Sequence, residues 1–170
     1  MNNEEYRLIY REAFQDEDTD FEDMLFKFCC EYIIDIKEKG ETASMLFALP
    51  CKFSSGLDEI KAIYIYAAAT KKVYRSKGYM AKLLNRAKEE NALIFLRPAD
   101  KSLEKYYSKF AFKSIIGVTD NSECSLVPLE GFKALTELIK PEKTGNKFTL
   151  MYYSENEIKA DKIEFSYSMN

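Results

Sequence analysis

Residues 63–81 decide the fold: they begin Ile63-Tyr64-Ile65-Tyr66-Ala67-Ala68-Ala69-Thr70 and continue, after a short link, Tyr74-Arg75-Ser76-Lys77-Gly78-Tyr79-Met80-Ala81. The first segment alternates its side chains as a β-strand does, and because both faces are apolar we expect this strand to be covered on both sides. The second segment is a basic glycine loop, and the helical spacing after it predicts an amphipathic helix whose apolar stripe is Met80, Leu83, Leu84 and Ala87. A helix N-terminus presents unpaired N–H groups and favours negative charge, so this loop is predicted to hold phosphate.

Other elements follow from periodicity and turn signals on either side of this stretch. Upstream, the pattern predicts a helix through Tyr6 and Ala13, a helix beginning near Thr19, strands at 32–36 and 43–53 joined by a charged turn, a loop at 52–59, and the central strand at 60–70. Downstream, it predicts a strand at 93–96, a helix through Leu103 and Phe110, a strand at 111–116, a helix at 129–139, a loop at 141–147, and strands at 148–153 and 163–167.

The chain length and the net charge limit the classes of protein that this sequence can belong to. A chain of 170 residues fits a single domain and can bury a full core. A formal net charge of −3 argues against general nucleic-acid binding, which needs a basic surface. No apolar run is long enough to span a bilayer, and residues 1–5 lack a signal-peptide pattern. We therefore expect a cytoplasmic protein with no nucleic-acid or membrane partner.

The cysteines and the missing histidine restrict the chemistry. The sequence has 4 cysteines, no C-x-x-C pair and 0 histidines, so no metal site is expected and the thiols are predicted to be buried and reduced. The usual Ser–His and Cys–His nucleophile pairs are also excluded. Proton transfer must therefore use carboxylates, tyrosine, lysine, cysteine or water.

Two motifs resemble the GNAT superfamily of acetyl-CoA-dependent N-acetyltransferases. The strand end at 67–70 running into Arg75-Ser76-Lys77-Gly78-Tyr79-Met80 looks like the family's [RQ]-x-x-G-x-[GA] pyrophosphate loop. After one intervening strand, Tyr106-Tyr107-Ser108-Lys109-Phe110-Ala111-Phe112 looks like the family's YEKxGF ending. The sequence departs from the pattern at Met80 and Ala111, and it begins in a helix where the family has its first strand.

This resemblance implies an α/β (α+β) fold with a mixed, mostly antiparallel central sheet flanked by helices on both faces. We expect one domain over 1–170, with its core at 1–116 and a C-terminal helix and strands at 117–170 completing the sheet. The central strands should splay where the cofactor enters.

The resemblance also implies acetyl-CoA as co-substrate. Backbone N–H groups from Arg75 to Ala81 would cradle the pyrophosphate, and the strand end would align the pantetheine arm. For Asp100 we favour helix capping, and for Ser102 both capping and a pantetheine contact stay open. The predicted cofactor-binding residues are Ala67, Ala68, Ala69, Arg75, Ser76, Lys77, Gly78, Tyr79, Met80 and Ser102.

The position of Tyr107 in the second motif implies the general acid that protonates the departing thiolate of coenzyme A. An unperturbed phenol has a pKa of about 10, so it can donate a proton at neutral pH. The alternative is a packed core tyrosine, because Tyr107 and Tyr106 both fall on an apolar helical stripe. A general base is not assigned; the carboxylates considered, each also explained as a surface residue, are Asp58, Glu59, Glu31 and Asp35.

The activity that this resemblance implies is acyl transfer from acetyl-CoA to a primary amine of a small molecule or peptide, by direct attack. Two alternatives stay open: a coenzyme A-binding module without turnover, and an interaction protein that forms a homodimer through its aromatic tail. That tail contains Phe148, Tyr152, Tyr153, Phe165 and Tyr167.

Overall fold

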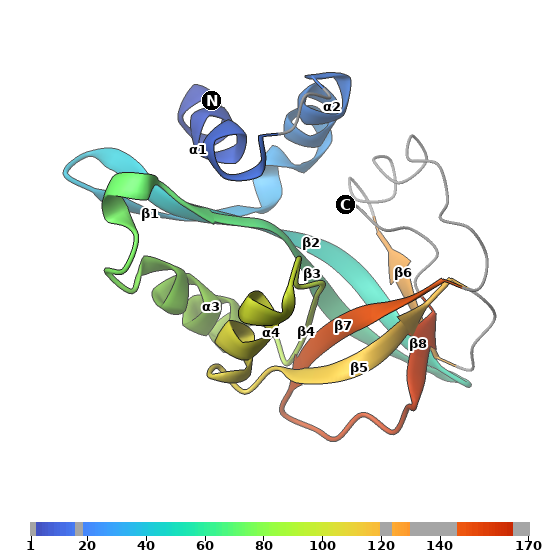
Figure 1. The fold of residues 1–170 in the computed structure, drawn as a ribbon. Helices are drawn as coiled ribbons and strands as arrows, with labels where there is room; N and C mark the ends of the chain where they lie inside the picture. The colour runs from blue at the N-terminus through green and yellow to red at the C-terminus, as the bar shows by residue number, and fades with distance from the viewer. Residues whose placement is uncertain (1–2, 16–18, 120–123, 130–145, 165–170) are drawn as a thin grey trace.

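The computed structural model describes residues 3–15, 19–119, 124–129 and 146–164. Its helices are α1 (Glu4–Phe14), α2 (Thr19–Cys29), α3 (Tyr79–Glu90) and α4 (Lys101–Ser108), with 3₁₀ turns at Cys30–Tyr32 and Lys72–Tyr74. Its strands are β1 (Ile33–Glu38), β2 (Glu41–Ser55), β3 (Asp58–Thr70), β4 (Leu93–Leu96), β5 (Lys113–Val118), β6 (Cys124–Pro128), β7 (Lys147–Ser154) and β8 (Lys162–Glu164). Figure 1 shows α1 and α2 on one face of the sheet and α3 and α4 on the other.

The sheet is mixed and mostly antiparallel, as predicted. Its strand order is β1-β2-β3-β4-β7-β5-β8-β6, and β6 also pairs with β2, so the sheet curls back on itself. The parallel pairs are β3 with β4, β5 with β8, and β6 with β8. The α+β class expected from the sequence is confirmed.

The core lies on both faces of the central strands. In β4, Leu93 and Phe95 join the cluster beneath α1 and α2, whereas Ile94 and Leu96 join the cluster against α3 and α4. All four side chains are buried, which follows from the period of two along a strand that is covered on both sides. In the same way, β3 places Tyr64 in the first cluster and Ile65 in the second, as the apolar pattern predicted.

The two central strands diverge beyond a short parallel contact. β3 pairs with β4 from Ile63 opposite Ile94 to Ile65 opposite Leu96; β4 then ends, while β3 continues to Thr70. Just past this point the register of β3 against β2 shifts, and Ala67 has φ +49°, which marks a β-bulge. A bulge bends its strand, so Ala67 marks the place where β3 bends beyond the end of its ladder with β4, which is where a splay was expected.

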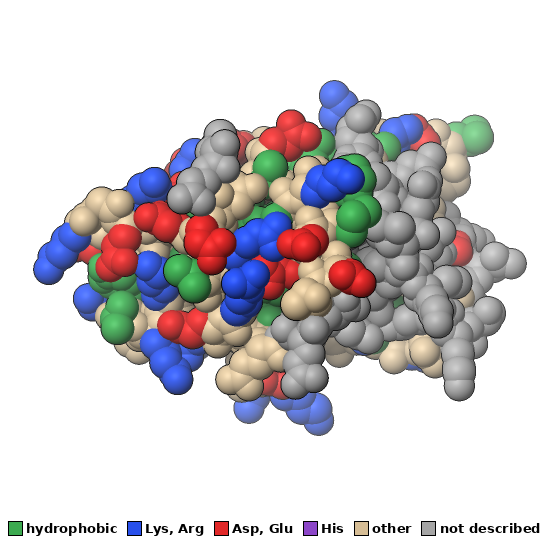
Figure 2. Space-filling view, turned by 90° about the horizontal axis from the view of Figure 1, so that it is seen from above, with side chains coloured by type: hydrophobic (Ala, Val, Ile, Leu, Met, Phe, Trp, Pro, Cys, Tyr) green, Lys and Arg blue, Asp and Glu red, His purple; other side chains and the backbone are tan. Residues whose placement is uncertain are grey.

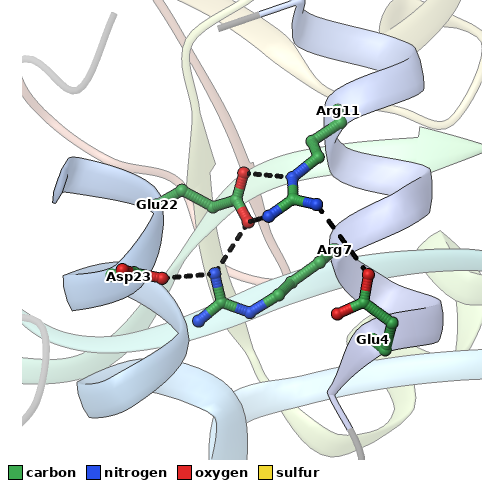
Figure 3. Close-up of polar contacts among 5 residues, drawn as sticks. All are labelled: Glu4, Arg7, Arg11, Glu22 and Asp23. Atoms are coloured by element: carbon green, nitrogen blue, oxygen red, sulfur yellow. Dashed lines mark hydrogen bonds and ion pairs between the residues drawn. The ribbon is translucent and has the colours of Figure 1, made fainter. Parts of the chain in front are cut away.

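An ion-pair cluster joins the two helices on the upper face. Glu22 of α2 is 3% exposed and accepts hydrogen bonds from Arg7 at 2.7 Å and from Arg11 at 2.8 Å, both on α1 (Figure 3). Arg7 also pairs with the exposed Asp23, and Arg11 lies 3.8 Å from Glu4. The buried carboxylate therefore fixes α1 against α2. Figure 2 shows acidic and basic side chains interspersed over this face.

The predicted helices and strands within residues 3–119 are present, with one correction. The prediction of a loop at 52–59 is wrong. β2 continues to Ser55, Gly56 at φ +61° opens a tight turn, and β3 starts at Asp58. The polar residues of this segment are held in the ladder by β3 on one side and by β6 on the other, which a reading of local propensity misses.

Strand β6 was not predicted, whereas the strand expected at 148–153 is present as β7. The strand expected at 163–167 is present as β8 in its described part. The helix expected at 129–139 falls, apart from residue 129, outside the described residues. The loop expected at 141–147 lies outside them up to residue 145, and its last residue, Lys147, is the first of β7. The described sheet begins with β1 after two helices, as the helical spacing of the N-terminal residues predicted.

Candidate functional site

The loop before α3 leaves a row of backbone donors without acceptors. Gly78 flanks the helix at φ +78°, Ser76 has φ +63°, and no side chain caps the helix. In the described part of the chain nothing accepts a hydrogen bond from the backbone N–H groups of residues 78–81, while the next amide, of Lys82, bonds back to the Gly78 carbonyl. Uncapped N–H groups at a helix start form an anion site.

Helix α4 shows the opposite arrangement, because its N-terminus is capped by Asp100. The Asp100 carboxylate accepts from the backbone N–H groups of Ser102 at 2.7 Å and Leu103 at 2.9 Å and from the Ser102 hydroxyl at 2.6 Å. These hydrogen bonds, the Ser102 hydroxyl first, lower the pKa of Asp100 below its usual value. The capping interpretation of Asp100 is confirmed, and the Ser102 hydroxyl is part of the same cap.

A pocket of about 550 Å³, the loop pocket, opens beside the uncapped end of α3. It is lined by the end of β3, the glycine loop, and the side chains of α4 that face α3. Eight of the predicted site residues line it: Ala68, Ala69, Arg75, Ser76, Gly78, Tyr79, Met80 and Tyr107. Lys77 and Ser102 do not line it; the Lys77 ammonium lies 5.0 Å from the centre of the Tyr74 ring instead.

The β1–β2 hairpin anchors this loop from outside. The hydroxyl of Tyr74 donates to Glu41 at 2.5 Å, and the hydroxyl of Tyr79 donates to Glu38 at 2.8 Å. Glu41 also pairs with Lys71 at 2.8 Å, and these hydrogen bonds lower the pKa of Glu41. Because Tyr74 precedes the uncapped segment and Tyr79 lies within it, the hairpin holds the loop in the conformation that exposes its N–H groups.

Helix α1 touches the same loop through a carboxylate. Glu12 accepts a hydrogen bond from the Lys72 backbone N–H at 2.6 Å and lies 3.9 Å from the Arg75 guanidinium. Arg75 also donates to the Thr70 carbonyl at 3.2 Å. The main cation of the loop therefore lies half-exposed at the pocket, next to an anionic side chain.

A second pocket of about 590 Å³, the strand pocket, lies where β3 and β4 diverge. Its walls are β3 from Tyr64 to Ala68, the segment from Leu96 to Lys101, the start of β7, and Phe14 at the end of α1. Ala67 lines this pocket rather than the loop pocket. Ala68, Leu103 and Tyr107 line both, so the two pockets meet at Tyr107.

Tyr107 is 7% exposed at this junction. Burial, with a smaller contribution from Tyr106, raises its pKa to about 12. In the described part of the chain its hydroxyl has no hydrogen-bond partner, although its ring packs 5.5 Å from that of Tyr106 and 5.9 Å from that of Phe112. The phenol is therefore both a core residue and a protonated donor that faces the two pockets, so the two interpretations of Tyr107 are compatible.

The turn after α4 fixes the backbone of this tyrosine. The Tyr107 carbonyl accepts from the Phe110 N–H at 2.9 Å, and Ala111, at φ +60°, reverses the chain where the motif usually has glycine. Lys88 of α3 donates to the Phe110 carbonyl and lies over the rings of Phe112 and Tyr153. The Ala111 departure is therefore accommodated, with a strained residue in place of glycine.

None of the carboxylates considered as a base lines either pocket. Asp58 and Glu59 lie at the β2–β3 turn, and Asp35 accepts a hydrogen bond from Tyr6 at 3.0 Å. Glu31 lies in the 3₁₀ turn before β1. Of the described acidic residues, the strand pocket brings together Asp100 and Glu104 instead.

Sequence reasoning also missed Phe14, Arg97, Glu104 and Phe148 in the strand pocket. The available signal was the helical spacing, which puts Glu104 one turn before Tyr107 on α4. Phe14 and Phe148 come from distant segments, so no local pattern marks them.

Within the described residues, no group of three histidine, cysteine or acidic side chains could hold a metal ion, and no helix is long and apolar enough to cross a membrane. Cys29, Cys51 and Cys124 are buried and free, whereas Cys30 is half-buried. The predicted reduced thiols are present, with Cys30 less enclosed than expected.

Sequence comparison finds no family model and no curated protein that matches this chain. Comparison of structures does find matches. A Bacillus subtilis acetyltransferase in complex with CoA aligns over 92% of this chain and 94% of its own at 14% identity, with a TM-score of 0.54. A Corynebacterium glutamicum protein described as histone acetyltransferase HPA2 and related acetyltransferase aligns over 94% and 96% at 14% identity, with a TM-score of 0.56.

A GCN5-related N-acetyltransferase from Anabaena variabilis aligns at 20% identity and a TM-score of 0.56, over 68% of this chain. The present chain spans only 31% of that larger protein's length, and 30% of a probable N-acyltransferase from Enterococcus faecalis. With the splayed β3–β4 pair and the uncapped loop, these likenesses lead to one conclusion: the chain has the GNAT fold of the GCN5-related N-acetyltransferases.

Proposed function

We propose that this protein is an N-acetyltransferase that moves an acetyl group from acetyl-CoA to a primary amine by direct attack. The observation that carries the proposal is the junction of two pockets at Tyr107, one at an uncapped helix N-terminus and the other at a strand splay. Fold likeness alone would not support an activity, because one fold hosts many functions.

The donor set of the loop pocket fits the pyrophosphate of coenzyme A. The open N–H groups of residues 78–81 supply directional donors, and the Arg75 guanidinium supplies charge. No Cβ is present at Gly78, and no atom lies within 4 Å of where one would be, so an anion can approach the backbone there. The β3 edge beyond Ile65, which β4 leaves unpaired, offers backbone groups for an extended pantetheine arm.

In the proposed reaction the acceptor ammonium first loses one proton, and the neutral nitrogen attacks the thioester carbonyl. The C–N bond forms, the C–S bond breaks, and the sulfur leaves with the bonding electron pair. Tyr107 gives its proton to this thiolate, and the proton released from the new amide nitrogen restores the phenol. The products are the acetylated amine, coenzyme A thiol and one proton to solvent.

Burial raises the pKa of Tyr107 to about 12, so the phenol carries the proton that it donates at neutral pH, as an ordinary phenol with a pKa of about 10 also does. Its hydroxyl, without a partner in the described residues, is available to the sulfur. Removing a positioned general acid typically lowers the rate by about 10²–10⁴-fold.

The test is release of coenzyme A thiol from acetyl-CoA in the presence of a panel of primary amines, for the wild type and for Tyr107→Phe. The variant should bind acetyl-CoA as the wild type does and lose at least about 100-fold in kcat. Tyr106→Phe is the matched control, because that residue lines only the loop pocket. Acetyl-CoA binding without thiol release across the panel would favour a coenzyme A-binding module instead.

A further inference from the structure

The strand pocket contains two described carboxylates, and one of them is already occupied. Asp100 and Glu104 both line the pocket. One Asp100 oxygen accepts hydrogen bonds from the Ser102 amide, the Ser102 hydroxyl and the Leu103 amide. A carboxylate that caps a helix in this way is held in place by the backbone, so Asp100 is poorly placed to bind a substrate cation.

Glu104 caps no helix and accepts fewer hydrogen bonds than Asp100, although each carboxylate has one oxygen that no described group binds. Its Oε1 accepts one hydrogen bond, from the Ser114 hydroxyl at 2.7 Å, and no other described group binds it. The residue is half-buried on α4, one helical turn before Tyr107 and on the same face. Ser114 therefore orients the carboxylate of a residue that lines the same pocket as Tyr107, and the second Glu104 oxygen has no partner among the described residues.

The remaining walls of the pocket combine aromatic rings with aliphatic side chains and two cations, Arg97 and Lys101. Phe14 of α1, Tyr66 of β3 and Phe148 of β7 come from three different elements. The Arg97 guanidinium lies over the Phe148 ring at 4.4 Å from its centre. Aromatic faces favour both apolar groups and organic cations, and about 590 Å³ is the size of a small-molecule site.

We infer that Glu104 binds the ammonium group of the acceptor, and that the acceptor is a primary amine attached to an apolar, ring-bearing body. This inference rests on the proposed function and specifies its substrate class. Glu104 holds the ammonium in the pocket and accepts the proton that it must lose before attack, and water then carries that proton to solvent. The acceptor's body lies among the rings of Phe14, Tyr66 and Phe148.

The experiment compares 2-phenylethylamine with ethanolamine as acceptors for the full chain. Burial of a phenyl ring should favour 2-phenylethylamine by roughly 10- to 100-fold in kcat/KM. Glu104→Gln keeps the shape but removes both the charge that holds the ammonium and the acceptor of its proton. It should lower kcat/KM for 2-phenylethylamine by roughly 10- to 100-fold, through a higher KM and a lower kcat. Binding of acetyl-CoA by calorimetry should be the same in the variant and in the wild type.

Two further variants separate a direct role from a structural one. Ser114→Ala removes the hydroxyl that orients Glu104 and should raise KM for the amine by a smaller factor, with kcat little changed. Glu89→Gln removes an exposed carboxylate from α3, outside both pockets, and should leave all constants unchanged.

Each failure has a distinct meaning. Unchanged amine kinetics in Glu104→Gln, or equal turnover of the two amines, overturns the inference. Acetyl-CoA binding without acetylation of 2-phenylethylamine also overturns it, while the cofactor proposal stands. Absence of acetyl-CoA binding to the wild type overturns the proposed function itself.

Discussion

Replacement of Glu22 by glutamine should destabilise the protein measurably, because Glu22 is the buried centre of the α1–α2 ion-pair cluster (Figure 3). The variant keeps the side-chain volume and removes the negative charge. Arg7 would retain the exposed Asp23, whereas Glu4, at 3.8 Å, would be the one ion-pair partner left to Arg11 among the described residues.

The magnitude follows from burial and geometry. Glu22 is 3% exposed, so its charged hydrogen bonds are poorly replaced by water. Breaking a buried pair costs about 3–5 kcal/mol, but the Arg7 side chain is 19% exposed and its charge is partly rehydrated when Glu22 is lost. We therefore expect a loss of about 2 kcal/mol in the free energy of unfolding, in line with hydrogen bonds to charged groups. For a chain of this size, the thermal midpoint should fall by about 4–8 °C.

Urea unfolding followed by circular dichroism measures this loss. The control is Asp23→Asn, because the Asp23 side chain is 71% exposed and its pair with Arg7 should contribute less than about 0.5 kcal/mol. A Glu22→Gln variant within about 0.5 kcal/mol of the wild type would refute the reasoning that a buried carboxylate locks α1 to α2.

Three further predictions concern the pockets. Gly117→Ala should cost about 1–3 kcal/mol in urea unfolding, because a Cβ there would overlap the ring of Phe148 on the neighbouring strand; unchanged stability would contradict the packing. The pKa of Tyr107 is raised to about 12, so the phenol stays protonated as the pH rises, and the acetylation rate should not fall with rising pH below about pH 10. A fall of the rate below about pH 10 that occurs in the wild type and not in Tyr107→Phe would contradict the high pKa. Glu12→Gln should tighten acetyl-CoA binding about two- to fivefold, because the negative carboxylate beside Arg75 repels an incoming phosphate. Calorimetry measures this change, and weaker binding would show instead that Glu12 supports the loop through its hydrogen bond to the Lys72 amide.

The elements that the sequence predicted well are those with strong periodicity. β3, α3 and β4 bury most of the residues that their patterns mark, because burial on two faces or along one stripe leaves a regular apolar signature; Met80 of the α3 stripe is only half-buried. The hairpin at Lys39-Gly40 was equally clear, since both residues have positive φ and the glycine favours that conformation.

The elements that it did not predict depend on partners that are remote in the chain. The segment Lys52 to Ser55 is polar and contains serines, yet it is a strand because β3 and β6 pair with its two edges. β6 ends in Pro128, which reads locally as a strand breaker, but Pro128 lies at the last position of the ladder opposite Cys51. Pairing of this kind is a tertiary property that overrides local propensity.

The residues of the candidate site also differ in how well the sequence predicted them. The loop from Arg75 to Met80 and the position of Tyr107 follow from contiguous motifs, and the fold brings them to one pocket. The strand pocket is assembled from α1, β3, α4 and β7, so its rings and Glu104 have no contiguous signature. The sequence therefore did not predict the residues of the strand pocket, whereas it predicted most of those that we assign to the loop pocket.

Calorimetric titration of the protein with acetyl-CoA, repeated on Gly78→Glu, tests the central claim most directly. Two controls separate the effect of the added charge from the strain of a non-glycine residue at positive φ. Gly78→Ala introduces the strain at the same position without the charge. Gly56→Glu introduces both the strain, at φ +61°, and the charge on the β2–β3 turn, outside both pockets. The account predicts saturable binding to the wild type, to Gly56→Glu and, more weakly, to Gly78→Ala, with binding lost in Gly78→Glu. Absence of binding to the wild type, or full binding to Gly78→Glu, would contradict the claim that the uncapped N-terminus of α3 holds the cofactor.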